Sequence, residues 1–422
     1  MSHYTKDIEK HSKNNRVPSI VLLCAFVYLI SYLGRLSFAA VTVDMIENDG
    51  FDKTLLAIPL TAISVTYGFG QLLFGYLGDK LSPEKMIFCG LLLTSGMNLS
   101  IPFTYFSVPI MTVMWSINGF AQAMMWPPIV KILTPHLSPQ VYRKNIFLIG
   151  WGSSLGTIIV YLFAPVAISV TSWRSVFFFS SVLALIVSII WICSIYKSEA
   201  AAAAAYKNKT EVKAVLDKPE PFKGFAVGLL LIIVAAVAMQ GVLRDGIATW
   251  MPTYITEVFK VESTISILTG VALPAFSMVT IWASAIIYRR CIRNESLCAA
   301  FFFVLCTLSV GVLTFASSAS AVLSVSMLMV ANAATHGVNM MYTSMVVPNF
   351  ARYGKTSFVT GLINSATYVG SALSTFGVAF IAECFGWGGT MVSWLIVSVV
   401  GTAIALLSTP WLNRLKKLNK AE

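Results

Sequence analysis

Twelve apolar segments follow one another along the chain, separated by shorter polar stretches. A helix needs about 20 mainly apolar residues to cross the hydrocarbon core of a bilayer, which is about 30 Å thick. The segments lie at residues 17–43, 54–78, 86–106, 108–130, 146–168, 173–196, 223–256, 264–288, 297–317, 320–347, 356–382 and 389–411. Their number and length predict an all-α membrane protein with twelve transmembrane helices.

The composition excludes most soluble classes of protein. Hydrophobic residues make up 57% of the 422 residues and charged residues 11%, whereas a soluble domain carries about 25% charged residues. This deficit excludes a soluble enzyme, a disordered protein and a secreted disulfide scaffold. The seven cysteines lie mostly inside apolar segments without CxxC spacing, and the loops show no nucleophile–base pair or phosphate-binding loop. We therefore expect no catalytic group, no metal and no cofactor.

The formal net charge of +11 has two explanations, nucleic-acid binding or basic cytoplasmic loops. If the N-terminus is cytoplasmic, 24 of the 29 Lys and Arg residues fall in segments on that side of the membrane. Only Lys53, Arg174 and Lys260 fall on the other side. The positive-inside rule therefore predicts a multi-pass protein of the cytoplasmic (inner) membrane with both termini in the cytoplasm, and no nucleic-acid partner.

The two remaining basic residues, Arg35 and Arg244, lie inside apolar segments and are 209 residues apart, close to half the chain length. Their surroundings also repeat, because the basic turn at 79–80 has a counterpart at 289–290. Two pseudo-symmetric six-helix bundles related by duplication, with equivalent residues meeting at their interface, are typical of a secondary transporter.

The longest polar gap lies between the sixth and seventh segments and marks the boundary between the two halves. The predicted parts are a cytoplasmic N-terminus (1–16), an N-terminal bundle (17–196), a cytoplasmic linker (197–222), a C-terminal bundle (223–412) and a cytoplasmic C-terminus (413–422). A run of six alanines, Ala200 to Ala205, favours a linker helix lying along the membrane.

An arginine inside a bilayer costs at least about 2.5 kcal/mol and stays charged. It can hold helices together by pairing with an acid or with backbone carbonyls, or it can bind an anion. Carboxylates are scarce inside the segments, where Asp245 and Glu383 are the candidates. Two guanidinium groups at matching positions favour an anion site, and their forked donors suit the oxygens of a phosphate.

Other polar side chains recur at helical spacing beside these arginines. Each set is also explained by interhelical hydrogen bonds, and His336 also by a packed, satisfied histidine. The sets are Tyr28, Tyr32 and Arg35; Tyr67 and Gln71; Asn118 and Gln122; Gln240 and Arg244; Asn332, His336 and Asn339; and Asn364 and Tyr368.

The loop after the second segment carries Gly75-x-x-x-Asp79-Lys80 followed by Lys85. The small residue lets neighbouring helices approach, and the acid can cap a helix N-terminus or pair with a base. This pattern resembles the loop signature of the major facilitator superfamily. The resemblance implies a role of this loop in conformational gating.

Within that superfamily, the chain resembles the organophosphate:phosphate antiporters, which include glycerol-3-phosphate and hexose-phosphate transporters. The stretches that carry the resemblance are Tyr-Leu-Gly-Arg at 32–35, Tyr-Gly-Phe-Gly-Gln at 67–71, Gln-Ala-Met-Met-Trp-Pro-Pro at 122–128 and Leu-Arg-Asp-Gly-Ile-Ala-Thr-Trp-Met-Pro-Thr-Tyr at 243–254. The resemblance implies that Arg35 and Arg244 bind the phosphate and that a central cavity is lined by Tyr28, Tyr32, Tyr67, Trp126 and Tyr368. We add Gln71, His336 and Asn339 as candidate substrate-binding residues.

The chain departs from the glycerol-3-phosphate branch at three positions. Gln71 stands where that branch has a lysine, residues 145–165 lack its histidine, and Asp245 replaces an aromatic residue. The site is therefore less cationic, which leaves a second hypothesis open: a proton- or sodium-coupled symporter of organic anions such as carboxylates or uronates, with Asp245 as a coupling acid. A third hypothesis is a membrane sensor of sugar phosphates that does not transport.

The sequence thus predicts a secondary transporter that exchanges a small organic phosphate for inorganic phosphate by alternating access. The expected partners are a small anionic substrate and the lipid bilayer, and the expected oligomeric state is a monomer.

Overall fold

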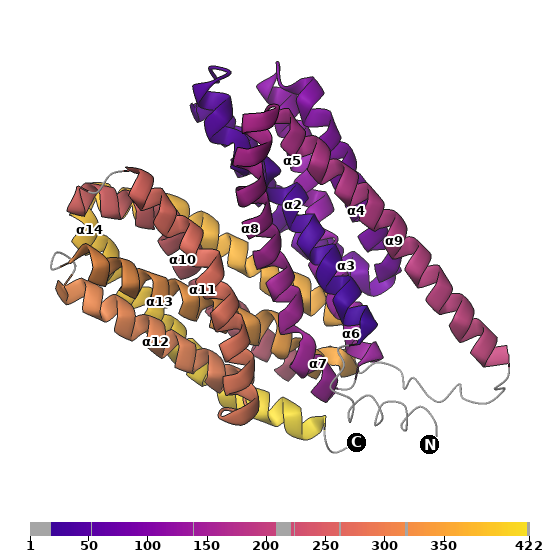
Figure 1. Ribbon diagram of the computed structural model, residues 1–422. Helices are drawn as coiled ribbons and strands as arrows, with labels where there is room; N and C mark the ends of the chain where they lie inside the picture. Colours follow the sequence, from indigo (N-terminus) through magenta and orange to yellow (C-terminus); the bar gives the residue numbers. More distant parts are fainter. Residues whose placement is uncertain are drawn as a thin grey trace. The chain divides into compact units, whose positions relative to one another are not determined.

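A computed structural model describes residues 18–51, 53–137, 139–207, 221–222, 224–260, 263–316 and 320–419. All regular elements within these ranges are helices (Figure 1). Nine of the helices formed by these residues are long and apolar enough to cross a membrane. Each of the twelve predicted segments is helical over most of its described residues.

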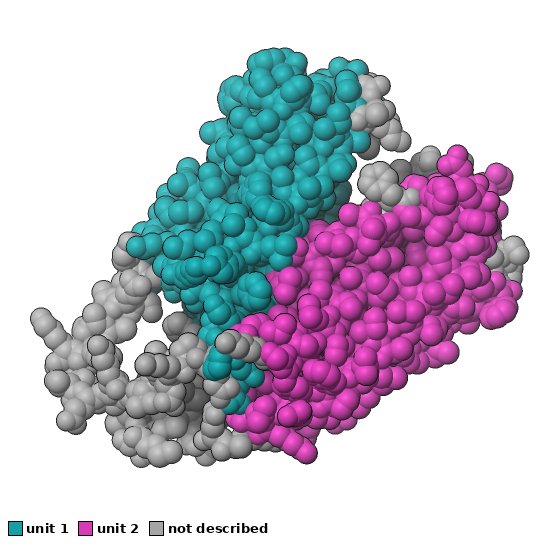
Figure 2. Space-filling model, turned by 180° about the vertical axis from the view of Figure 1, so that it is seen from behind, with its two compact units in different colours: residues 1–221, 351–361 teal, residues 222–350, 362–422 magenta. Residues whose placement is uncertain are grey.

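Contacts between residues divide the chain into two compact units, coloured separately in Figure 2. Unit 1 comprises residues 1–221 and 351–361, and unit 2 comprises residues 222–350 and 362–422. The helices of the first stretch are α2 (Ser19–Glu47), α3 (Lys53–Lys80), α4 (Pro83–Thr104), α5 (Val108–Ala123), α6 (Trp126–His136), α7 (Pro139–Asn145), α8 (Phe147–Val170) and α9 (Arg174–Lys207). The later helices are α10 (Phe225–Phe259), α11 (Ser263–Arg290), α12 (Glu295–Ala316), α13 (Ala321–Asn339), the π-helix η1 (Met340–Met345), the 3₁₀ helix η2 (Val347–Tyr353) and α14 (Thr356–Leu418).

The fourth and tenth predicted segments each span more than one helix, since the tenth, 320–347, runs from α13 through η1 into η2. The fourth segment is split into α5 and α6, because Met124 leaves the helical conformation and prolines follow at the start of α6. The eleventh and twelfth segments are two helices that meet at a non-helical kink at Gly386, where φ is 67°, and α14 comprises both, as the sequence predicted. The glycine permits this left-handed conformation, since it lacks a Cβ atom.

The alanine run belongs to α9, which continues as one helix to Lys207, and Figure 1 shows its last turns extending beyond the other helices of unit 1. Alanine has the highest helix propensity, so the helix does not end where the apolar segment ends. Residues 208–220, which complete the predicted linker, lie outside the described residues.

Each unit joins its first helix to its sixth by the same type of bond. In unit 1 the indole N–H of Trp173, just before α9, donates to Asp49 just after α2, at 2.6 Å. In unit 2 the indole N–H of Trp387, just after the bend in α14, donates to Glu257 near the end of α10, at 2.8 Å. Matching bonds at matching places in the two halves support the duplication inferred from the arginines.

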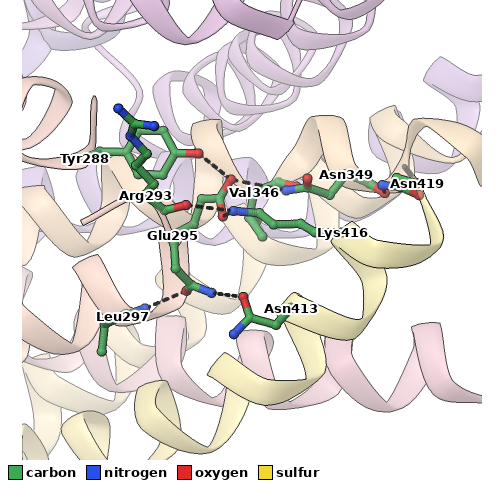
Figure 3. Close-up of polar contacts among 10 residues, drawn as sticks. Tyr288, Arg293, Glu295, Leu297, Val346, Asn349, Asn413, Lys416 and Asn419 are labelled. Atoms are coloured by element: carbon green, nitrogen blue, oxygen red, sulfur yellow. Dashed lines mark hydrogen bonds and ion pairs between the residues drawn. The ribbon is translucent and has the colours of Figure 1, made fainter. Parts of the chain in front are cut away.

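A buried acid fastens the last turns of α14 to the start of α12 (Figure 3). Glu295 is fully buried, forms an ion pair with Lys416 and accepts a hydrogen bond from the Tyr288 hydroxyl at 2.8 Å. Lys416 also donates to the carbonyl of Arg293 at 3.2 Å, and Asn294 donates to Asn413 at 2.7 Å. Removing one partner of a buried pair leaves an uncompensated charge.

We therefore expect Lys416→Met to destabilise the protein by about 2 kcal/mol, because it leaves the Glu295 carboxylate buried without its cation. The double variant Lys416→Met/Glu295→Gln should lose less than the sum of the two single variants. Thermal unfolding of the purified protein in detergent measures all three losses. Additive losses would show that the pair contributes no coupling energy.

Candidate substrate-binding site

Arg35 lies near the middle of α2 and is half-buried. The backbone beside it is fixed by neighbouring helices, because the Gly34 carbonyl accepts hydrogen bonds from the side-chain amides of Asn98 (2.9 Å) and Asn118 (3.0 Å). Asn98 in turn accepts a hydrogen bond from the Ser37 hydroxyl at 2.6 Å. The sequence allowed either a substrate-binding or a packing role for Asn118. Its hydrogen bond to Gly34 joins α5 to α2.

Aromatic rings surround the Arg35 guanidinium within unit 1. Its central carbon lies 4.0 Å from the ring centroid of Tyr67 and 5.5 Å from that of Tyr32. Tyr28 contacts the rings of both Tyr32 (5.1 Å) and Trp126 (5.2 Å). A cation held against aromatic faces keeps its charge while its desolvation is partly offset.

Glycines of α8 allow it to lie directly against α2. A Cβ atom placed on Gly152 would lie 2.5 Å from the carbonyl oxygen of Ala25, and one on Gly156 would lie 2.5 Å from that of Leu29. Backbone-to-backbone contact fixes the height and rotation of α2. The direction in which Tyr28, Tyr32 and Arg35 point is fixed with it.

Arg244 lies in the middle part of α10 and forms a bidentate ion pair with the next residue, Asp245. The distances are 2.6 Å from Nε to Oδ1 and 2.8 Å from Nη2 to Oδ2. Neither side chain is fully buried, with 16% of Arg244 and 25% of Asp245 exposed. The sequence predicted both residues as functional, but it did not predict this bond.

Three further side chains of unit 2 face this pair. The hydroxyl of Ser371 on α14 is hydrogen-bonded to Asp245, and His336 on α13 lies close enough to interact electrostatically with both members of the pair. The guanidinium carbon of Arg244 lies 5.9 Å from the ring centroid of Tyr368. Arg244, Asp245, His336 and Tyr368, which the sequence singled out separately, are therefore neighbours in space.

Several buried polar atoms of unit 2 have no hydrogen-bond partner among the described residues. They are both amide atoms of Gln240 and the amide oxygens of Asn332 and Asn339. Gln240 lies one turn before Arg244, whereas Asn332 and Asn339 flank His336 on α13. Such atoms are costly unless water or a ligand satisfies them, and they stay candidate ligand contacts.

The helices α10 and α14 touch without intervening side chains beside Arg244. A Cβ atom on Gly241 would lie 2.1 Å from the carbonyl oxygen of Thr367, and one on Gly370 would lie 2.1 Å from that of Ala238. This contact places Tyr368 and Ser371 next to the turn that carries Arg244 and Asp245. In both units, therefore, a glycine contact positions the arginine-bearing helix.

The loop predicted to act in gating makes specific contacts within unit 1. The Asp79 carboxylate accepts hydrogen bonds from the backbone N–H groups of Ser357 and Phe358, both at 3.0 Å. These groups belong to the first turn of α14, so Asp79 caps that helix from α3. A Cβ atom on Gly75 would lie 2.9 Å from the Cα atom of Gly361, so this glycine permits the approach.

Basic residues of this loop have distinct places. Lys80 contacts the ring and hydroxyl of Tyr76, and the side chain of Lys85 is exposed. Lys131 on α6 donates to the carbonyls of Gly78 and Leu81 and caps the C-terminal end of α3.

Asp79→Ala should lower the exchange rate about tenfold, because both capping hydrogen bonds are lost, each contributing about 1 kcal/mol. Asp79→Asn keeps one acceptor oxygen and should lie between the wild type and the alanine variant. Uptake into proteoliposomes containing equal amounts of each variant measures the effect. Equal rates for all three proteins would exclude a gating role of this cap.

The predicted site residues thus form one cluster in each unit. The unit 1 cluster consists of Arg35 and the rings of Tyr28, Tyr32, Tyr67 and Trp126, and Gln71 is buried on α3 one turn after Tyr67. The unit 2 cluster consists of Arg244, Asp245, His336 and Tyr368. Sequence reasoning missed Ser371 and Asn98, because a serine or asparagine inside an apolar helix gives no sign of which partner it bonds.

The family of the chain follows from comparison with known proteins. Residues 24–375 match the Major Facilitator Superfamily. The chain belongs to this family. It is a multi-pass membrane protein of a family of transporters, which act on small-molecule substrates.

Two relatives within this superfamily have similar sequences over part of their length. The chain is 28% identical over 243 residues to a glycerol-3-phosphate transporter of Bacillus subtilis, a match that covers 54% of each protein. It is 28% identical over 167 residues to a probable hexose phosphate transport protein of Chlamydia trachomatis, over 39% of this chain and 36% of that one. The chain thus matches about half or less of the length of these relatives.

A solved transporter of the superfamily, FucP in its outward conformation, has a similar fold. The TM-score is 0.68 at 12% identity, over 94% of this chain and 99% of that one. This likeness confirms the predicted all-α membrane fold of the major facilitator type. At this identity it carries no information on substrate.

Proposed function

We propose that the protein is a secondary transporter that carries a small organic phosphate, such as glycerol-3-phosphate, a sugar phosphate or a phosphoglycerate, in exchange for inorganic phosphate. The observation that supports this most is a guanidinium group in the middle of the first helix of each half, Arg35 and Arg244. The names of the matched relatives, a glycerol-3-phosphate transporter and a hexose phosphate transport protein, agree with it.

In this proposal both arginines bind the phosphoryl oxygens of the substrate. A phosphate accepts several hydrogen bonds, and a guanidinium fork donates two in one plane. Tyr28, Tyr32, Tyr67, Trp126 and Tyr368 shape the cavity, and Gln71, His336 and Asn339 supply further polar contacts. The organic group then determines which phosphate ester is accepted.

Alternating access follows from the cost of an empty site. Each guanidinium group pays a desolvation cost that a bound phosphate offsets, so a phosphate held by both arginines stabilises the occluded state. A carrier of this kind changes conformation efficiently only when loaded, and therefore exchanges one phosphate compound for another.

Proteoliposomes preloaded with phosphate test this proposal. They should take up labelled phosphate and labelled glycerol-3-phosphate, and vesicles without internal phosphate should take up little. Binding of ligand without accumulation would instead identify a non-transporting sensor, and the exchange proposal would be wrong.

A second function, symport of an organic carboxylate with protons or sodium, is favoured by one observation, the neutralisation of Arg244 by Asp245. An arginine whose charge is already balanced by an acid suits a carboxylate, which carries less negative charge than a phosphate dianion. Uptake that needs an imposed pH or sodium gradient, without stimulation by internal phosphate, would support symport and contradict exchange.

We also propose that the protein acts as a monomer without enzymatic activity in the cytoplasmic membrane, with both termini in the cytoplasm. The distribution of 24 of the 29 basic residues supports this orientation. Cysteines introduced at the two termini, labelled in intact cells with a reagent that does not cross the membrane, test this orientation.

A further inference from the structure

Basic side chains gather at one end of unit 2, away from the candidate substrate-binding residues. The turn from α11 to α12 meets the end of α14 there, because Asn294 donates a hydrogen bond to Asn413 at 2.7 Å (Figure 3). Residues 285–297 and 409–419 together carry six basic residues and one acid, Glu295. These two segments therefore have an excess of positive charge.

Two of the six cations are bound within the protein. Lys416 pairs with the buried Glu295, and Arg289 donates from Nε to the carbonyl of Ala285 at 3.0 Å. The other four are exposed and form no ion pair with an acid among the described residues. These four, which we call the basic cluster, are Arg290, Arg293, Arg414 and Lys417. Exposed cations that no acid neutralises can bind an anion from outside the protein.

The basic cluster lies where apolar helices end. Helices long and apolar enough to cross a membrane begin at Phe225 and at Glu295, and another ends at Leu418. The ring of Trp411 stacks on that of Phe225 with centroids 5.2 Å apart, and the guanidinium carbon of Arg414 lies 4.9 Å from the Phe225 centroid. Aromatic rings and basic side chains at helix ends are typical of the headgroup level of a bilayer. The basic cluster therefore lies at the level of lipid headgroups.

An exposed apolar face continues from the basic cluster along α14. Leu407 lies seven residues before Arg414, which is about two helical turns and places both on the same face. The Leu407 side chain is 58% exposed, and Ala403, about one turn earlier, is exposed as well. A ligand that contacts both the cation and this face has an anionic head and an apolar body. An anionic phospholipid has this combination, whereas inorganic phosphate and nucleic acids lack it.

We propose that the basic cluster binds the headgroup of an anionic phospholipid, whose acyl chains lie along the exposed face of α14. Guanidinium groups donate charge-assisted hydrogen bonds to the oxygens of the phosphodiester. Each Lys or Arg near an anionic membrane surface raises the affinity about fivefold. The inference goes beyond the proposed function, because this ligand is bound at the membrane surface and is not the transported substrate.

The experiment follows the melting temperature of the purified full chain in detergent during titration with a lipid. Dioleoyl phosphatidylglycerol is the anionic probe, and dioleoyl phosphatidylcholine, which has no net charge, is the comparison. Saturating inorganic phosphate is present throughout, so that the proposed substrate site is filled. We expect phosphatidylglycerol to raise the melting temperature and phosphatidylcholine to change it little, because a ligand that binds the folded state stabilises it.

The double variant Arg293→Gln/Arg414→Gln should bind phosphatidylglycerol about 25-fold more weakly, about fivefold for each cation removed. Lys260→Gln is the matched control, because it removes an exposed cation just beyond the opposite end of α10. This control should keep the wild-type affinity. The single variant Arg293→Gln, with an expected loss of about fivefold, tests the inference even if the double variant does not fold.

The outcomes separate this inference from the proposed function. Equal stabilisation of the wild type by both lipids would overturn the inference, and so would an unchanged affinity of the double variant for phosphatidylglycerol. An equal loss in Lys260→Gln would mean that the lipid responds to the total charge of the protein, which also contradicts a site at the basic cluster. Inorganic phosphate without lipid should stabilise the wild type and the double variant alike. Absence of this effect in the wild type would contradict the proposed function, whereas the comparison of the two lipids would still decide the inference.

Discussion

Replacing either Arg35 or Arg244 by lysine is expected to reduce phosphate exchange about 100-fold while leaving membrane insertion intact. Lysine keeps the positive charge but lacks the planar fork that donates two parallel hydrogen bonds. Each lost charge-assisted hydrogen bond contributes about 1.5–3 kcal/mol, and about 1.4 kcal/mol corresponds to a factor of ten. Counterflow of labelled phosphate in proteoliposomes measures the loss.

Arg174→Lys is the matched control for these variants. Arg174 also stacks on aromatic rings, those of Tyr105 (4.5 Å) and Trp173 (4.4 Å), but it lies at the start of α9 and pairs with Asp49. Its substitution should leave exchange unchanged. Normal exchange by both Arg35→Lys and Arg244→Lys would falsify the paired-arginine proposal.

Gly370→Ala is expected to destabilise the protein by about 3 kcal/mol and to lower exchange at the same time. The added Cβ atom would lie 2.1 Å from the carbonyl oxygen of Ala238 and 2.9 Å from the backbone nitrogen of Val242. Backbone atoms cannot turn away as side chains can, so α10 must shift, and Arg244 shifts with it.

Gly377→Ala, on the same helix, provides the comparison. A Cβ atom at Gly377 has no neighbour within 4 Å among the described atoms. It should therefore leave both thermal stability and exchange nearly unchanged, apart from a small gain from the higher helix propensity of alanine. Equal melting temperatures for the two variants would contradict the close contact between α10 and α14.

Hydropathy predicted where the long helices lie, because a helix that is buried in lipid needs apolar residues along its length. It did not predict the break between α5 and α6, since the run 108–130 contains no charged residue that would interrupt it. The two segments 356–382 and 389–411 were predicted as separate, and the non-helical backbone at Gly386 lies between them. An apolar run thus indicates the environment of a segment, whereas its continuity is a local conformational property.

For the candidate site, charge in an apolar setting was the strongest signal, and it identified Arg35, Arg244 and Asp245. The side chains to which these residues bond were less predictable. Helical spacing groups residues three or four positions apart, so it could not anticipate a bond between adjacent residues of α10. The cap on α14 joins Asp79 to residues 278 and 279 positions later in the chain, a contact that only the fold creates.

The two indole–carboxylate bonds have a mechanical consequence. Trp173 with Asp49, and Trp387 with Glu257, each tie the end of an arginine-bearing helix to the helix that completes its half. A displacement of the arginine-bearing helix is therefore coupled through this hydrogen bond to the sixth helix of the same bundle. The acid is aspartate in the first half and glutamate, longer by one methylene group, in the second. We therefore expect the arginine-bearing helix of each bundle to move together with the sixth helix.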